Sequence, residues 1–262
     1  MNVLEANGIS IHWREDGQSD GVPVVFCNSL GTDLRLWDAL MPHLPAGFRF
    51  IRFDNRGHGL TEATPAPYTL DMLVSDAEAV VEKVAGGPVI FVGLSIGGII
   101  GQALALRRPD LVRALFLSNT SSRFGTAEMW QQRIDAVEAG GVASLTEAIL
   151  DRWFSKAGRH APDVALWRAM VERTPAAGYT GCSAALRDAD IRGEIGALDL
   201  PVFALTGDED GATPPEVMRA TADLIPGARM EVIPGTGHLP CVEKPEAYAA
   251  LLNPFLKEHQ NG

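Results

Sequence analysis

Cysteine and positive charge are both scarce in this sequence. The 262 residues include 3 cysteines, Cys27, Cys182 and Cys241, which lie far apart and form no C-x-x-C pair. A disulfide framework would need a denser set, so we expect reduced thiols in a cytoplasmic chain. Because 33 acidic residues exceed 22 Lys and Arg, the formal net charge is −11. Such a field repels phosphate backbones, and we therefore expect no nucleic-acid partner.

Long hydrophobic runs are also missing. No segment reaches the length of a membrane span, and the first residues lack the basic region and apolar stretch of a signal peptide. We therefore expect no membrane partner. Hydrophobic residues nevertheless make up 46% of the chain, which is ample for one sizeable core.

What the sequence does contain is an alternation of two apolar patterns. Short β-branched or aromatic runs predict strands, and between several of them a helical spacing of apolar residues predicts helices. The clearest helix begins after Thr69, a candidate N-cap residue. Strands that are apolar throughout and alternate with helices indicate the α/β class, with a mostly parallel sheet covered on both faces. The predicted strands are residues 22–27, 48–53, 89–92, 114–117, 202–205 and 230–233.

The N-terminus departs from this alternation. Two short strand-like segments flank Asn7-Gly8, a dipeptide that suits a tight hairpin turn. We expect this hairpin to add an antiparallel edge to the sheet.

A second departure lies between about Thr120 and Leu198, where no convincing strand occurs. Helical patterns cover residues 127–139 and 145–154, and a loop-like segment covers 174–178. We therefore expect a helical cap, residues 120–198, inserted in a core of residues 1–119 and 199–262. The cap should cover one end of the sheet.

The pentapeptide Gly93-Leu94-Ser95-Ile96-Gly97 joins a predicted strand to a predicted helix. G-x-S-x-G in this context is the nucleophile elbow, in which a strained turn exposes the serine hydroxyl. Flanking glycines avoid side-chain clashes, and the new helix N-terminus presents backbone N–H groups to an oxyanion. We therefore predict that Ser95 is a nucleophile.

A serine nucleophile needs a histidine base, which an acid must orient. With such an elbow, the acid follows the serine and the histidine comes last along the chain. Of the three later histidines, His160 lies in the expected cap and His259 lies near the chain end. His238 follows the last predicted strand and is the predicted base. His58 precedes Ser95 and is a weaker candidate.

The acid that would orient His238 is less obvious, because Asp208, Glu209 and Asp210 all follow one predicted strand.

The oxyanion of an acyl-transfer intermediate also needs at least two preorganised donors. One is the backbone N–H of Ile96. The second should come from the loop after the strand at residues 22–27, and we predict the backbone N–H of Leu30.

Together these motifs resemble the α/β-hydrolase superfamily over essentially the whole chain. Hydrolases of this type show a G-x-x-D spacing after the corresponding strand, which implies Asp210 as the acid, with Asp208 as the alternative. The turn from Asp54 to Gly59 (D-x-R-G-x-G) recurs across the superfamily, and we interpret it as a brace for the active-site loops. Asn28-Ser29 stands where many relatives have His-Gly, which makes the Leu30 assignment less direct.

Other segments resemble the 3-oxoadipate enol-lactonases. The resemblance is carried by Asn28 to Asp38, Glu128 to Asp135, Arg152 to Phe154 and, above all, Gly178 to Asp190. It implies hydrolysis of 3-oxoadipate enol-lactone in the β-ketoadipate branch of bacterial aromatic degradation, with neither metal nor organic cofactor. Ser183 stands where the family often has a second cysteine.

The implied small-molecule substrate is an anionic lactone, so this acidic chain must supply a local cation. Arg133 and Arg187, which lie within the family-like segments, are the predicted carboxylate ligands. Trp130 and Trp153 are predicted to line the pocket, although both could simply pack the cap.

A carboxylesterase or cofactor-free perhydrolase is the main alternative function; a C–C hydrolase and a triad-retaining receptor are weaker alternatives. The oligomeric state does not follow from the sequence.

Overall fold

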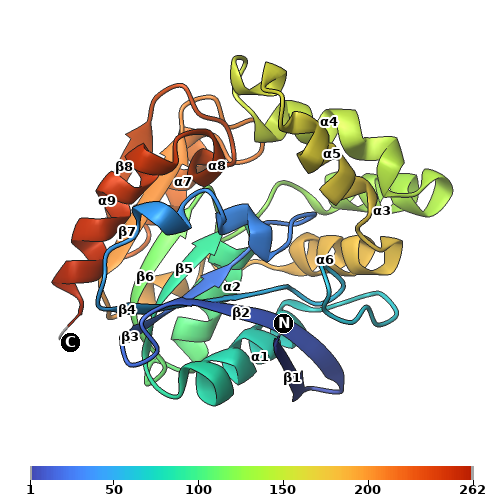
Figure 1. Cartoon of the computed structure of the whole chain (residues 1–262). Helices are drawn as coiled ribbons and strands as arrows, with labels where there is room; N and C mark the ends of the chain where they lie inside the picture. Colours follow the sequence, from blue (N-terminus) through green and yellow to red (C-terminus); the bar gives the residue numbers. More distant parts are fainter. Residues whose placement is uncertain (1, 261–262) are drawn as a thin grey trace.

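The computed structural model describes residues 2–260, which form an eight-stranded sheet with the order β1-β2-β4-β3-β5-β6-β7-β8 (Figure 1). Every neighbouring pair from β4 to β8 is parallel, whereas β1 pairs antiparallel with β2, and β2 with β4. The mostly parallel sheet and the antiparallel N-terminal edge are thus confirmed. The strands are β1 Asn2–Ala6, β2 Ile9–Gly17, β3 Val22–Cys27, β4 Phe48–Phe53, β5 Val89–Leu94, β6 Val112–Ser118, β7 Val202–Gly207 and β8 Arg229–Ile233.

Helices cover both faces of this sheet because its central strands are apolar on both sides. Successive side chains of a strand point to opposite faces. On β6, Leu115 lies next to Gly101 of α2, whereas Phe116 packs edge-on against Phe255 of α9. The helices that flank the sheet are α1 Leu70–Val80, α2 Ile96–Arg107, α7 Pro215–Ala222, α8 Pro240–Glu243 and α9 Pro245–Glu258. The Thr69 side chain caps α1 by accepting a hydrogen bond from the backbone N–H of Met72, as the sequence predicts.

Four more helices lie between β6 and β7, and Figure 1 shows them grouped to one side of the sheet. They are α3 Ala127–Gly140, α4 Thr146–Trp153, α5 Val164–Glu172 and α6 Ala176–Asp188. The hydrophobic core runs through this region and the sheet without interruption, since Val171 and Leu186 belong to the same cluster as Phe91. The division into cap and core at residues 119/120 and 198/199 remains a prediction.

The loop predicted at residues 174–178 is wrong for most of its length, because α6 already begins at Ala176. Pro175 precedes the helix, where its fixed φ suits a helix start. The small residues that follow allow close packing. A Cβ on Gly178 would lie 2.0 Å from the carbonyl oxygen of Gly57. Small side chains here therefore serve a tight helix–loop contact.

The three cysteines are free and buried, and burial raises the pKa of each thiol well above its usual value. They are therefore poor nucleophiles. Within residues 2–260, no helix combines the length and the apolar character needed to cross a membrane.

Candidate active site

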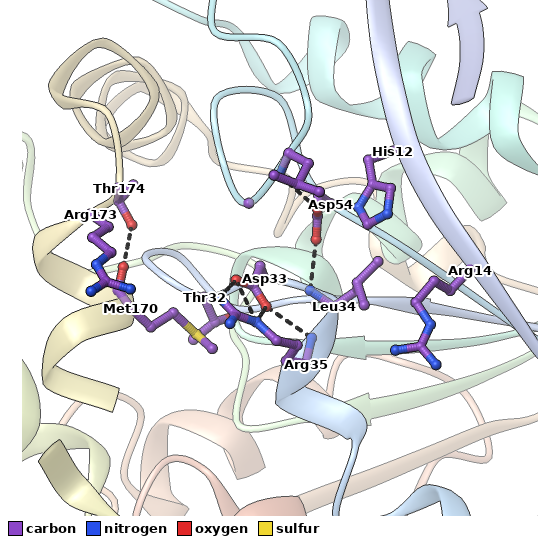
Figure 2. A pocket seen from close by; sticks show the side chains of 12 residues that line it. His12, Arg14, Thr32, Asp33, Leu34, Arg35, Asp54, Met170, Arg173 and Thr174 are labelled. Carbon is purple, nitrogen blue, oxygen red and sulfur yellow. Dashed lines mark hydrogen bonds and ion pairs between the residues drawn. The ribbon is translucent and has the colours of Figure 1, made fainter. Parts of the chain in front are cut away.

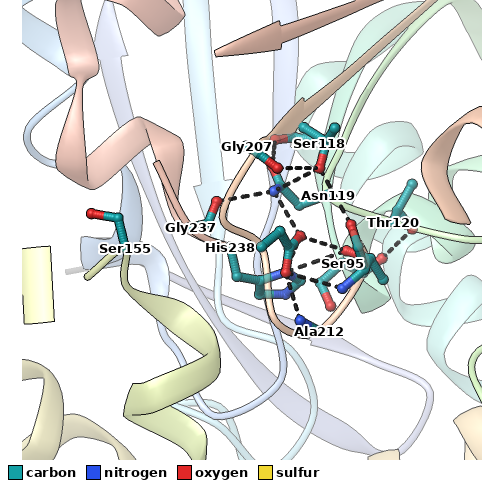
Figure 3. A network of polar contacts seen from close by, with 12 residues as sticks. Ser95, Ser118, Asn119, Thr120, Ser155, Gly207, Ala212, Gly237 and His238 are labelled. Carbon is teal, nitrogen blue, oxygen red and sulfur yellow. Dashed lines mark hydrogen bonds and ion pairs between the residues drawn. The ribbon is translucent and has the colours of Figure 1, made fainter. Parts of the chain in front are cut away.

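Ser95 occupies the sharp turn between β5 and α2 with φ 58° and ψ −119°, a conformation that non-glycine residues rarely adopt. Its backbone N–H donates to the carbonyl of Ser118 at 3.0 Å. The Thr120 hydroxyl donates to the carbonyl of Ser95 at 2.6 Å (Figure 3). These two bonds hold the strained turn in place against β6.

The two glycines of the pentapeptide are required by close backbone contacts. A Cβ on Gly97 would lie 2.2 Å from the carbonyl oxygen of Cys27, and one on Gly93 would lie 2.4 Å from the carbonyl oxygen of Gly97. Neither position has room for a side chain, so the turn can form only with glycine on both sides of Ser95.

Asp210 and His238 form a buried pair. Nδ1 of His238 lies 2.9 Å and 3.1 Å from the two carboxylate oxygens of Asp210. Asp210 also accepts hydrogen bonds from the Asn119 amide at 2.9 Å and the Thr213 hydroxyl at 2.8 Å. The backbone N–H of Ala212 donates to the same carboxylate at 2.7 Å. Figure 3 shows Asn119, Ala212 and His238 converging on this point.

This environment keeps the Asp210 carboxylate charged. Burial alone would raise its pKa, but the adjacent His238 and the hydrogen bonds from Asn119 and Thr213 outweigh burial and lower the pKa from 3.8 to about 2. A charged Asp210 fixes the tautomer of His238 that carries its proton on Nδ1, which leaves Nε2 to accept a proton.

The two neighbouring carboxylates lie elsewhere. Asp208 accepts a 2.6 Å hydrogen bond from the backbone N–H of Gly235 and is exposed. Glu209 is exposed too and accepts from the backbone N–H of Lys156 at 2.8 Å. The structure therefore brings Asp210, rather than Asp208, to His238.

The cavity that contains Ser95 and His238 has a volume of about 230 Å³, and His238 is the one histidine of residues 2–260 that lines it. His160 is exposed, and His259 lies against the ring of Phe255 at the end of α9. In this structure Ser95 and His238 share the cavity without a hydrogen bond between them, a separation often seen before substrate binds.

His58 and the Asp54–Gly59 turn brace the neighbouring loop. The backbone N–H of Gly31 donates to Nε2 of His58 at 3.0 Å, and Nδ1 of His58 lies 3.1 Å from the carbonyl of Arg56. Burial lowers the pKa of His58, so the ring is held neutral. Because both ring nitrogens have backbone partners, the contacts of His58 favour a bracing role over the role of catalytic base.

Two backbone N–H groups, those of Ile96 and Leu30, are the predicted oxyanion donors. Ile96 is the first residue of α2, so its N–H has no intrahelical acceptor. Leu30 lies in the loop after β3 and lines the cavity with Ser95. Among the described residues, neither N–H group has a hydrogen-bond acceptor. Both stay available to a developing negative charge.

The other wall of the cavity comes from the helices between β6 and β7. Trp130 and Arg133 of α3 and Trp153 of α4 all line it. The Arg133 guanidinium lies 5.4 Å from the ring centroid of Trp130 and 6.0 Å from that of Tyr179. Within residues 2–260, Arg133 has no carboxylate partner. A half-buried guanidinium thus faces the Ser95 cavity without a counter-ion.

Arg187 lies differently from what the sequence predicts. It donates to Asp188 at 2.8 Å and to the Gln131 side chain at 2.6 Å, and it does not line the Ser95 cavity. Its charge is paired with that of Asp188 on the surface of α6. Of the two predicted arginines, the structure brings only Arg133 to Ser95.

Several residues of this site were not identified from the sequence. Arg152 and Tyr179 line the cavity, while Asn119 and Thr213 hold Asp210. The positive φ of Asn119, 48°, has no local sequence signal beyond its place after a predicted strand. For Arg152, the one sequence feature that could have indicated a role in the cavity is its position in a segment that resembles the enol-lactonases.

Comparison with known proteins identifies the family of this chain. A family model described as "Alpha/beta hydrolase family" matches residues 24–251. The 3-oxoadipate enol-lactonase 2 of Acinetobacter baylyi is 28% identical over 259 residues, which cover 98% of this chain and 96% of that protein.

Solved structures give the same result. The enol-lactonase from Burkholderia xenovorans LB400 superposes with a TM-score of 0.94 at 33% identity, over 98% of this chain and 100% of that one. A thermophilic esterase from Thermogutta terrifontis superposes with a TM-score of 0.90 at 26% identity, over 99% of this chain and 97% of that one. The resemblance to the enol-lactonases is confirmed, and the chain belongs to the alpha/beta hydrolase family.

Proposed function

We propose that this protein hydrolyses 3-oxoadipate enol-lactone to 3-oxoadipate with Ser95 as nucleophile, which would be a step of the β-ketoadipate pathway in the cytoplasm. Its relatives make it a hydrolase of esters or lactones. The observation that carries the narrower proposal is the Arg133 guanidinium, which lines the Ser95 cavity and has no carboxylate partner among the described residues. The enol-lactone carries a free carboxylate, which is the counter-ion that this cation lacks.

In the first half of the reaction, Oγ of Ser95 attacks the lactone carbonyl while Nε2 of His238 takes the hydroxyl proton. The resulting oxyanion lies against the backbone N–H groups of Ile96 and Leu30. Collapse of the tetrahedral intermediate breaks the ring C–O bond. The leaving oxygen departs as an enol or enolate, a better leaving group than a simple alkoxide. It takes the proton held on Nε2 of His238, which returns to its neutral form, and the enol becomes the ketone.

In the second half, His238 takes a proton from water, which attacks the ester that joins the opened substrate to Ser95. Collapse of this intermediate returns the proton to Ser95 and releases a new carboxylate. The charged Asp210 stabilises the imidazolium that forms in both halves. The sequence of steps consumes one water molecule and requires neither metal nor organic cofactor.

The Arg133 assignment is tested with two matched variants. We expect Arg133→Ala to lower kcat/KM on the enol-lactone by about 10- to 100-fold, because one charge-assisted interaction is lost. Its rate on a neutral aryl ester should change little. Arg187→Ala, whose charge is already paired with Asp188, should behave as wild type on both substrates. Equal losses on both substrates for Arg133→Ala would contradict a carboxylate ligand.

A carboxylesterase is the second candidate. The aromatic side chains of Trp130 and Trp153 in the cavity, and the similarity to the Thermogutta terrifontis esterase, favour an apolar acyl group. A strong preference of the wild-type protein for aryl esters over the enol-lactone would support this alternative.

Perhydrolysis is distinguished by measuring turnover with added peroxide, and C–C hydrolysis by measuring turnover of a diketo acid. A receptor would be modified at Ser95 without turnover.

A further inference from the structure

A second cavity, of about 380 Å³, lies between β2 and the C-terminal end of α5 (Figure 2). Its remaining walls are the loops that follow β3 and β4. It shares no lining residue with the Ser95 cavity. Figure 2 shows Arg173, after α5, on one side and His12 and Arg14, on β2, on the other.

The carboxylates of this second cavity are already satisfied by the protein. Asp54 accepts hydrogen bonds from the backbone N–H groups of Leu34 at 2.7 Å and Leu60 at 2.9 Å, and its Oδ2 lies 2.7 Å from Nδ1 of His12. Asp33 accepts from the Arg35 side chain at 2.5 Å and 2.9 Å. Asp33, Asp54 and Arg35 therefore already have hydrogen-bond or ion-pair partners within the protein.

The remaining cations are only partly satisfied. Within residues 2–260, the Arg173 side chain makes no hydrogen bond or ion pair. Arg14 forms one long ion pair with Asp16, with 3.9 Å between nitrogen and oxygen, and no hydrogen bond joins them. His12 is only 8% exposed, and its Nε2 has no partner among the described residues, while its Nδ1 faces Asp54. The cavity thus holds one guanidinium without a partner, that of Arg173, a second in a single long ion pair, and a ring nitrogen of His12 without a partner among the described residues.

We propose that this cavity is a second binding site, for a small linear dicarboxylate that spans from Arg14 to Arg173. A guanidinium offers a planar pair of N–H donors that matches one carboxylate. Two guanidiniums on opposite sides of one cavity match a ligand with a carboxylate at each end. Nε2 of His12, between β2 and the ligand, meets a polar group of that ligand.

Occupation of this site would connect distant parts of the chain. Arg14 belongs to the antiparallel edge of the sheet, and Arg173 is the C-cap residue of α5. Thr32 and Leu34, which also line the cavity, directly follow the loop that carries the Leu30 N–H group. A bound dicarboxylate therefore fastens α5 to the sheet beside an oxyanion donor. Hydrolysis of a carboxylated lactone yields a dicarboxylate, so a link to the product rests on the proposed function, whereas the binding site itself does not.

The test is calorimetric titration of adipate into Arg133→Ala protein, in which the Ser95 cavity keeps only the Arg152 guanidinium, which donates to the carbonyl of Ala148. We expect binding in this background, weakened about tenfold or more when Arg14→Ala or Arg173→Ala is added, because each removes one charge-assisted contact. Arg168→Ala, also on α5 but paired with Glu147, is the matched control and should bind adipate like the parent. Acetate should bind more weakly than adipate.

Three results would overturn the proposal. The first is no adipate binding to Arg133→Ala protein. The second is binding by the added Arg14→Ala and Arg173→Ala variants that is as tight as that of the Arg133→Ala parent. The third is acetate or inorganic phosphate binding as tightly as adipate. The same titration is repeated with wild-type protein that carries a phosphonate on Ser95, which provides a second background if Arg133→Ala alters folding. Failure to hydrolyse the enol-lactone would remove the proposed function and leave this binding experiment intact.

Discussion

The backbone N–H of His238 donates a 2.8 Å hydrogen bond to the carbonyl oxygen of Trp153. Trp153 is the last residue of α4, and it also lines the cavity that contains Ser95. The proposed base is therefore held by the same helix that forms the substrate-facing wall. A change in the position of α4 would reach His238 directly.

Glu243 is predicted to strengthen this connection. Its carboxylate accepts hydrogen bonds from the backbone N–H of Gly237 and from the Ser155 hydroxyl, both at 2.6 Å. Glu243→Gln removes the charge and one acceptor, so we expect kcat to fall about tenfold through misplacement of His238. The rate at which a phosphonate labels Ser95 should fall in parallel.

Glu246→Gln is the matched control, because Glu246 is exposed in the first turn of α9. It should leave both rates unchanged. A Glu243→Gln protein that loses stability but keeps the wild-type labelling rate would show that Glu243 does not position His238.

Asp210 and Asp208 should differ sharply on substitution. Asp210→Asn removes the group that fixes the His238 tautomer, and we expect kcat to fall by about 10³- to 10⁴-fold. Asp208→Asn, which affects the contacts with the backbone N–H groups of Gly235 and Thr236, should keep most of the activity. Steady-state rates of the two purified variants on one ester decide the matter; similar losses would argue against Asp210 as the acid.

Acid should weaken the fold partly through Asp210. Its pKa of about 2 lies below the ordinary value of 3.8, so its contribution to stability is fully present above about pH 4 and is lost as the pH falls toward 2. A shift of this size corresponds to about 2 kcal/mol. Urea unfolding of wild type and Asp210→Asn should therefore give free energies that converge between pH 4 and pH 2. A constant difference over that range would contradict the paired carboxylate.

The strained turn at Ser95 should be visible in stability. Glycine adopts a φ of 58° without a Cβ clash, so Ser95→Gly relieves strain that Ser95→Ala keeps. After allowing for the greater entropy of unfolded glycine, we expect Ser95→Gly to be more stable than Ser95→Ala by about 1 kcal/mol. Chemical unfolding measures the difference. Equal stability, or a less stable Ser95→Gly, would mean that the turn stores no strain.

The parts of the site that are local in sequence could be predicted from it. The turn at Ser95 depends on five consecutive residues and follows an apolar run, β5. The strand before His238, β8, is recognised by its β-branched and apolar residues although it also contains Arg229 and Glu231. Chain order and the position after a strand were enough to separate His238 from His160 and His259. These features need no knowledge of how the helices pack.

Features that depend on helix packing could not be predicted in the same way. Arg133 and Arg187 lie on α3 and α6, which pack against each other, and only the rotation of each helix decides which arginine faces the cavity. Glu243 contacts Ser155 across 88 residues of sequence, so no local pattern indicates the pair. The helical start at Ala176 was missed because the run of small residues reads as a loop until its contact with Gly57 is known.

The most direct test of the central claim is the ratio of kcat/KM on freshly generated 3-oxoadipate enol-lactone to that on a neutral aryl ester, for wild type and Ser95→Ala. We predict that wild type prefers the enol-lactone by about 10²-fold or more, since Arg133 contributes only with the charged substrate. Ser95→Ala should lose turnover of both. A wild-type protein that prefers the aryl ester, or a Ser95→Ala protein that still opens the lactone, would contradict the account.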